Sequence, residues 1–210
     1  MSKPINLEDM KPILFNTKMV KAILDGSKTQ TRRVLKTKHP IDGIEHYNDR
    51  LKDKDYDWSG FSKEFRPKYK LGDVLYVRET WNECTLEQLL DSEPRNLING
   101  RYIVYRADGE KVHPVYGKAL WRPSIHMPKK YARIFLKVTD VRVERLQESF
   151  VGDADDIQYS CEQEGAPDSC YYPHDYSAWW ENLWNSTAKD GYKWENNPYV
   201  FVYEFERVEK

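Results

Sequence analysis

The clearest helical pattern in the chain lies near its N-terminus, between Lys18 and Asp25. Apolar residues recur there at the spacing of one helix face. Thr17 has a side chain suited to cap the start of this helix, and Gly26 can take the left-handed conformation that ends many helices. The pattern therefore predicts a short amphipathic helix. Its apolar positions are Met19, Val20, Ile23 and Leu24.

After Gly26 the period changes from helical to alternating. Thr29, Thr31, Arg33 and Leu35 alternate with Gln30, Arg32 and Val34, which predicts a strand. Other short runs, some alternating and some continuously apolar, predict further strands along the chain. The longest of them fits one strand or two strands broken near Thr139. These runs lie at residues 13–15, 74–78, 102–106, 133–145 and 199–208.

Two more helices are predicted in the C-terminal third of the chain. Residues 153–164 place apolar side chains roughly on one side and end at Gly165, and residues 174–185 have a heavily aromatic face. Short strands outnumber the helices between them. This arrangement predicts an α+β fold, a small mixed β-barrel with flanking helices and long loop insertions, rather than a doubly wound sheet.

Residues 36–69 interrupt these patterns. The stretch is charged and lacks a sustained period, so it is predicted to be a long insertion in the barrel. Insertions of this length often act as lids or partner surfaces, and simple disorder is the alternative. Trp58, Phe61 and Phe65 favour some packing. Because no Gly/Ser- or Pro-rich linker divides the chain, residues 1–210 are expected to form one domain.

The charge balance limits the classes of function. The 210 residues carry 33 basic and 34 acidic side chains, which gives a formal net charge of −1. A protein that coats DNA without sequence preference is usually strongly basic, so any nucleic-acid site is expected to be a local patch. Aromatic residues make up 14% of the chain. They serve both cores and base-stacking surfaces.

Neither a membrane segment nor a metal site is predicted. No apolar run approaches the ~20 residues of a membrane span, and the N-terminus lacks the apolar core of a signal peptide. Cys84, Cys161 and Cys170 match no zinc spacing, and the five histidines are dispersed. We therefore expect a cytoplasmic protein of a bacterium or a phage-infected cell, with reduced thiols and without a cofactor.

The best candidate for chemistry is the basic cluster of Lys28, Arg32 and Arg33 beside Thr31. A lysine, a hydroxyl and two guanidinium groups suit an anionic or carbonyl-bearing ligand, and a solvated basic turn is the alternative. A threonine hydroxyl is a weak nucleophile until a base takes its proton. A lysine can be that base only where burial or neighbouring cations lower its pKa.

The cluster lies in the pattern G-x-K-x-x-T-x-R, which resembles the signature of the ASCH superfamily. Gly26, Lys28 and Arg33 fall on its Gly, Lys and Arg, and Thr31 replaces the usual Glu. Thr also stands at that position in a subset of the superfamily, the bacterial N4-acetylcytidine amidohydrolases. A wider set of stretches is similar to ASCH-domain proteins encoded by phages and prophages. These are residues 12–17, 72–81, 105–108, 121–128 and 197–205.

The resemblance implies a PUA-like barrel that holds a nucleoside or a base of RNA or DNA. In the amidohydrolases the catalytic set is a Lys, the Thr three residues later and a Glu on a later helix. Carried onto this chain, the set is Lys28, Thr31 and Glu164, with Glu162 as the nearby alternative. Thr31 would then attack the N4-acyl carbonyl, Lys28 would act as base, and Glu164 would position or protonate the leaving amine.

Several residues are candidates for holding the substrate, because an arginine can grip a phosphate and an aromatic ring can stack on a base. A purely structural role for each tryptophan is the alternative. Three functions stay open: amide hydrolysis of N4-acylated cytidine, RNA or modified-base binding without turnover, and ribonuclease activity. Thr31 at the Glu position favours the first over the third. The predicted substrate-binding residues are Gly26, Arg32, Arg33, Arg78, Glu79, Trp81 and Trp121.

Overall fold

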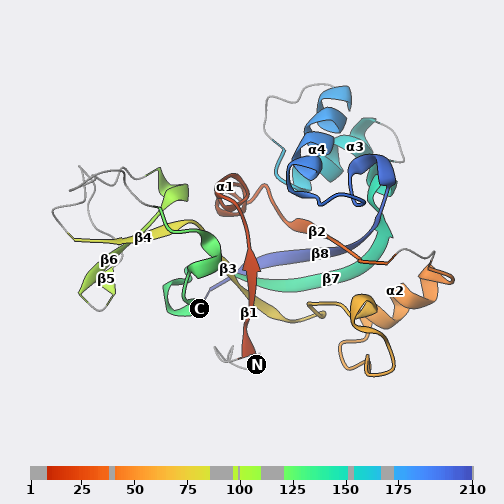
Figure 1. The fold of residues 1–210 in the computed structure, drawn as a ribbon, viewed down its shortest axis with the longest axis horizontal. Helices are drawn as coiled ribbons and strands as arrows, with labels where there is room; N and C mark the ends of the chain where they lie inside the picture. Colours follow the sequence, from red (N-terminus) through yellow and green to blue (C-terminus); the bar gives the residue numbers. More distant parts are fainter. Residues whose placement is uncertain are drawn as a thin grey trace. The chain divides into compact units, whose positions relative to one another are not determined.

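The computed structural model describes residues 9–37, 41–85, 97–98, 100–109, 121–150, 154–166 and 173–209 (Figure 1). The chain divides into two compact units. The first comprises Met1–Asp25, Val74–Leu136 and Arg207–Lys210, and the second comprises Gly26–Asp73 and Lys137–Glu206. Each unit has a cluster of buried hydrophobic side chains of its own.

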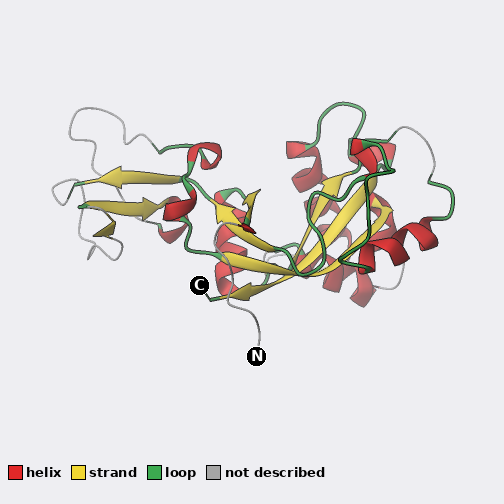
Figure 2. Cartoon of the chain, turned by 90° about the horizontal axis from the view of Figure 1, so that it is seen from below, coloured by secondary structure: helices red, strands yellow, loops and turns green. Residues whose placement is uncertain are grey.

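The described residues form a mixed α+β fold, as the sequence predicts (Figure 2). The α-helices are α1 (Thr17–Asp25), α2 (Ile44–Lys52), α3 (Ala154–Gln163) and α4 (Pro173–Thr187). The strands are β1 (Lys11–Leu14), β2 (Gln30–Val34), β3 (Val74–Arg78), β4 (Trp81–Cys84), β5 (Leu97–Ile98), β6 (Arg101–Tyr105), β7 (Phe135–Arg145) and β8 (Tyr199–Val208). Hydrogen bonds join them into two sheets, with strand orders β1-β3-β7-β8-β2 and β4-β6-β5.

Neither sheet closes on itself within the described residues. Strands β1 and β2 stand at the two ends of the longer order, where β1 pairs with β3 and β2 pairs with β8. The closed barrel expected from the strand pattern is therefore corrected to two open sheets. Alternation specifies which side chains share a face, but it does not specify whether the edge strands meet.

In the first unit, helix α1 follows strand β1, which runs parallel to β3. The predicted helix is confirmed, but its cap is not Thr17. The Met19 N–H donates to Asn16 Oδ1 over 2.9 Å, and Thr17 already lies inside the helix. Asn16 is an equally favourable capping residue, since its short side-chain oxygen reaches the first turn in the same way.

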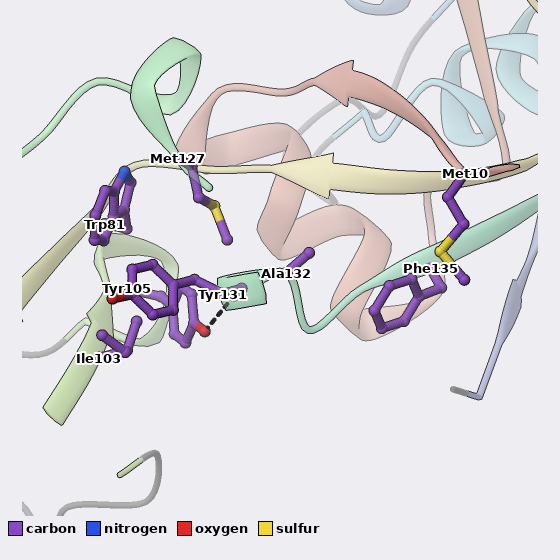
Figure 3. Close-up of a cluster of buried hydrophobic side chains, with 8 residues drawn as sticks. All are labelled: Met10, Trp81, Ile103, Tyr105, Met127, Tyr131, Ala132 and Phe135. Atoms are coloured by element: carbon purple, nitrogen blue, oxygen red, sulfur yellow. Dashed lines mark hydrogen bonds between the residues drawn. The ribbon is translucent and has the colours of Figure 1, made fainter. Parts of the chain in front are cut away.

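Figure 3 shows the hydrophobic core of the first unit. The rings of Trp81 and Tyr131 lie 5.1 Å apart, and the Tyr105 hydroxyl donates to the Tyr131 carbonyl over 2.6 Å. The hydrogen bond allows the polar end of a buried tyrosine to remain inside an apolar cluster. The core residues are Met10, Trp81, Ile103, Tyr105, Met127, Tyr131, Ala132 and Phe135.

In the second unit, helices α3 and α4 pack with strand β8 around one hydrophobic core. Trp180 and Trp184 of α4 are buried there with Val200 and Val202 of β8. Both predicted C-terminal helices are confirmed, and the long alternating run ending at Arg145 forms one strand, β7, rather than two. The aromatic face of α4 is thus a packing surface.

The charged insertion, residues 36–69, contains an unpredicted helix, α2, and an aromatic cluster. Trp58 lies 5.4 Å from Tyr47 and 5.0 Å from Phe61, measured between ring centroids. Tyr47 also contacts Phe201 of β8 at 6.5 Å. These contacts decide against disorder for the described residues 41–69 and confirm that the insertion packs.

Candidate active site

Lys28 and Glu164 are joined by the backbone as well as by their side chains. Gly26 has a φ of 87°, the left-handed region that glycine adopts without strain. Two residues later, Lys28 forms an isolated antiparallel bridge with Glu164, and the Thr29 N–H donates to the Gln163 carbonyl over 3.0 Å. The residue just past the end of α3 is therefore fixed beside the residues that lead into β2.

The Lys28 side chain is fully enclosed, with an exposed fraction of 0%. Its Nζ donates to Glu164 Oε2 over 2.6 Å and to the Glu164 carbonyl over 3.0 Å. Burial lowers the pKa of the Lys28 amine below its ordinary 10.5, Glu164 opposes this shift, and Arg33 and Arg32 add to it. Removal of an ammonium from water outweighs the attraction of the carboxylate here. The amine consequently loses its proton more easily than an exposed lysine.

Arg32 binds the other oxygen of the same carboxylate. Its Nη1 donates to Glu164 Oε1 over 2.7 Å, and its Nε donates to Glu144 Oε1 over 3.0 Å. The guanidinium carbon lies 5.3 Å from the centroid of the Trp180 ring, within the range of a cation–π contact. Glu164 thus has one cation on each oxygen, which holds its carboxylate in one orientation.

Thr31 and Arg33 lie on the face of β2 opposite Arg32, because strand side chains alternate. Thr31 is the cross-strand partner of Tyr203, and its exposed fraction is 3%. Burial next to the sheet therefore keeps most of the solvent away from the Thr31 side chain.

Arg33 contributes positive charge from this second face. Burial lowers the pKa of Arg33, while Tyr69, Glu164 and Tyr203 oppose the shift. The same guanidinium helps to lower the pKa of Lys28. Lys28, Arg33 and Glu164 are therefore within electrostatic reach of one another, and Lys28 and Arg32 each contact Glu164 directly.

Of the two alternative carboxylates, Glu164 is the one that contacts Lys28. Glu162 instead accepts a hydrogen bond from Gln158 Nε2 over 2.8 Å on the exposed side of α3. Glu164 reaches inward because it follows the last residue of the helix, where the chain turns at Gly165.

The other predicted substrate-binding residues belong to the first unit, where their described contacts are structural. Arg78 Nε donates to the Met127 carbonyl over 2.8 Å. Trp81 has an exposed fraction of 2% inside the core shown in Figure 3. Trp121 is half-buried and packs against a small core formed by Cys84 of β4 and Val104 of β6. The positions of Trp81 and Trp121 therefore fit a structural role, the alternative to stacking on a base.

Glu79, also in the first unit, is held by Arg133. The Nε and Nη2 of Arg133 donate to the Glu79 carboxylate over 2.9 and 3.1 Å, and the same guanidinium donates to Asp108 over 2.8 and 2.7 Å. Burial raises the pKa of the Glu79 carboxyl, which Arg133 opposes. The carboxylate is thus enclosed in a fork of arginine hydrogen bonds.

Sequence reasoning misses two neighbours of the site, Glu144 and Trp180. Trp180 is visible in the sequence as part of an aromatic helix face, and Glu144 lies in an alternating strand. Neither signal says that both side chains meet Arg32, because that depends on which strands and helices become neighbours. The contact between Glu144 and Arg32 depends on the strand order β7-β8-β2, and the contact with Trp180 depends on where α4 packs.

Three further observations concern metal ligands, membrane spans and cysteines. In the described part of the chain, no three His, Cys, Asp or Glu side chains are grouped to hold a metal ion. None of the described helices has the length and apolar character needed to cross a membrane. Cys84 and Cys161 have buried thiols, and Cys170 lies outside the described residues.

No family model, no curated protein and no solved structure matches the chain.

Proposed function

We propose that the chain is an ASCH-type protein of PUA-like ancestry that hydrolyses the amide of N4-acylated cytidine. The observation that supports this most strongly is the buried Lys28 amine, whose lowered pKa and 2.6 Å contact with Glu164 suit a base. Thr31, three residues further along the chain, provides a hydroxyl for that base to activate.

In this reaction Thr31 Oγ1 attacks the acyl carbonyl and Lys28 takes the hydroxyl proton. The new O–C bond forms as the C–N4 bond breaks, and the proton passes to the leaving amine of cytidine. Glu164 positions Lys28 during this transfer. Water then hydrolyses the acyl–threonine ester, which releases a carboxylic acid and restores the hydroxyl.

The ion pairs favour this reaction over simple phosphate recognition by Lys28 and Arg32. Both cations already bind carboxylate oxygens, at 2.6 and 2.7 Å for Glu164 and at 3.0 Å for Glu144. A phosphate would have to displace these carboxylates before either cation could bind it. The proposed proton transfer from the Thr31 hydroxyl to Lys28 involves no anion that would have to replace these carboxylates.

The test is a deacylation assay of purified protein on N4-acetylcytidine, with cytidine release followed by chromatography. The wild type should release cytidine, and Thr31→Val should lower turnover by roughly 10³-fold or more, the scale for loss of a nucleophile. Thr139→Val changes an exposed threonine of β7 and should retain the wild-type rate.

Lys28→Ala should cost about as much turnover as Thr31→Val, and the double variant should be little worse than either, because residues acting as a unit are not additive. Wild-type protein that releases no cytidine from any N4-acylated cytidine would refute the proposed reaction. Equal turnover by wild type and Thr31→Val would remove Thr31 as the nucleophile.

A further inference from the structure

Lys68, near the end of the charged insertion, is attached to the sheet of the second unit. Its backbone N–H donates to the Tyr203 hydroxyl over 3.2 Å, and its exposed side chain places Nζ 5.1 Å from the centroid of the Tyr69 ring. The rings of Tyr69 and Tyr203 meet edge-on at 5.1 Å. These contacts fix the backbone at Lys68 against strand β8.

This attachment puts Lys68 on the same face as Thr31 and Arg33. Tyr203 is the cross-strand partner of Thr31, and paired residues of antiparallel strands share a face. Arg33 lies two residues beyond Thr31, about 7 Å along that face. Tyr69 and Tyr203 both raise the pKa of Arg33, which opposes the effect of burial. The insertion thus adds a second cation beside the one that the strand provides.

Arg33 and Lys68 interact electrostatically. Partial desolvation lowers the pKa of the Lys68 amine, and the charge of Arg33 lowers it further. An anion bound between two like charges stabilises both, and a guanidinium beside an ammonium is a combination well suited to phosphate oxygens.

We propose that Arg33 and Lys68 form a phosphate subsite, so that the acylated cytidine is bound as a nucleotide or within RNA rather than as a free nucleoside. The identity of the base rests on the proposed function; the phosphate subsite does not. Arg33 grips the phosphate oxygens through its fork of donors, and Lys68 contributes a point charge at the solvent side. The reacting carbonyl lies toward Thr31 on the same face.

The test compares binding of cytidine, cytidine 5′-monophosphate, cytidine 3′-monophosphate and a short cytidine-containing RNA by calorimetry, at low and at high salt. At least one phosphorylated ligand should bind wild-type protein roughly tenfold to hundredfold more tightly than cytidine at low salt. The advantage should shrink at high salt. The tightest ligand identifies whether a monoester or a diester occupies the subsite.

Lys68→Met and Arg33→Gln should each remove most of the phosphate advantage, whereas Lys63→Met, an exposed lysine of the same insertion, should retain it. Lys68 is exposed, so its variant tests the proposal even where Arg33→Gln lowers the folded yield. Wild-type protein without a phosphate preference overturns the subsite, and so does an undiminished preference in Lys68→Met. A phosphate preference without deacylation would refute the proposed reaction and leave the subsite standing.

Discussion

Each unit of the chain contains a buried glutamate held by cations, and the two arrangements differ in one chemically decisive way. In the first unit Arg133 binds two carboxylates, those of Glu79 and Asp108. In the second unit Glu164 is held by Arg32 and by Lys28. An arginine keeps its proton at any ordinary pH, whereas a buried lysine can release one.

The pKa shifts of the two clusters follow this difference. The carboxylates around Arg133 raise the pKa of that guanidinium, so the first cluster is a fixed ion pair. Burial lowers the pKa of Lys28 despite its contact with Glu164, so the second cluster can exchange a proton. The two glutamates are similarly buried, at 1% and 3% exposed, but only the second is paired with a group whose pKa is lowered, and we propose acid–base chemistry for that cluster alone.

The largest expected effect comes from making the second cluster resemble the first. Lys28→Arg keeps a positive charge beside Glu164 but cannot act as a base, so turnover on N4-acetylcytidine should fall by roughly 10³-fold or more. Lys28→Met, which also lacks the base but fits the enclosed space more easily, should fall as far. A Lys28→Arg variant with near-wild-type turnover would show that the lysine is only a cation.

A smaller effect, on stability, is shared by both clusters. Glu164→Ala should lower the free energy of unfolding by about 3–5 kcal/mol, because it removes the carboxylate that pairs with the fully enclosed Lys28. Glu79→Ala should lower it by less, because Arg133 is partly exposed and keeps its hydrogen bonds to Asp108. Urea unfolding measures this loss. Turnover per folded molecule should survive Glu79→Ala and fall sharply in Glu164→Ala. Glu162→Ala, on the exposed side of α3, should change stability by no more than about 0.5 kcal/mol.

Replacing the arginine of the first cluster by lysine should lower the free energy of unfolding by a smaller amount. Arg133→Lys retains the charge but replaces a fork that contacts Glu79 and Asp108 through four hydrogen bonds. The free energy of unfolding should fall by about 1.5–3 kcal/mol, the scale of one hydrogen bond to a charged group. An unchanged urea midpoint in Arg133→Lys would mean that the geometry of the fork does not stabilise the first unit.

The smallest predicted effect concerns alkaline pH. Burial raises the pKa of Tyr69 from 10.0 to about 12. The unfolded chain therefore loses this proton first, and stability that is complete below pH 10 should decline as the pH rises toward 12. The Tyr69 share should reach about 1.4 kcal/mol by pH 11. Tyr69→Phe should flatten that part of the pH profile, and an identical decline in this variant would exclude Tyr69 as its source.

Local features of the site were predictable from the sequence, and its surroundings were not. The spacing of Lys28 and Thr31 and the start of β2 are properties of eight consecutive residues, so a pattern can carry them. Glu164 was placed by resemblance and by its position before Gly165. The contacts of Arg32 with Trp180 join segments about 150 residues apart, as do many contacts of the sheet, and no local period encodes them.

The central claim is that Lys28 is a buried amine with a lowered pKa, and an NMR titration of lysines labelled at their Cε carbons measures this directly. The Lys28 signal is assigned as the one that is missing from the spectrum of Lys28→Met. The Lys28 signal should titrate below 10.5, and in Glu164→Gln it should titrate lower still, because the carboxylate opposes the shift. A Lys28 signal that titrates at or above 10.5 in the wild-type protein would contradict the account.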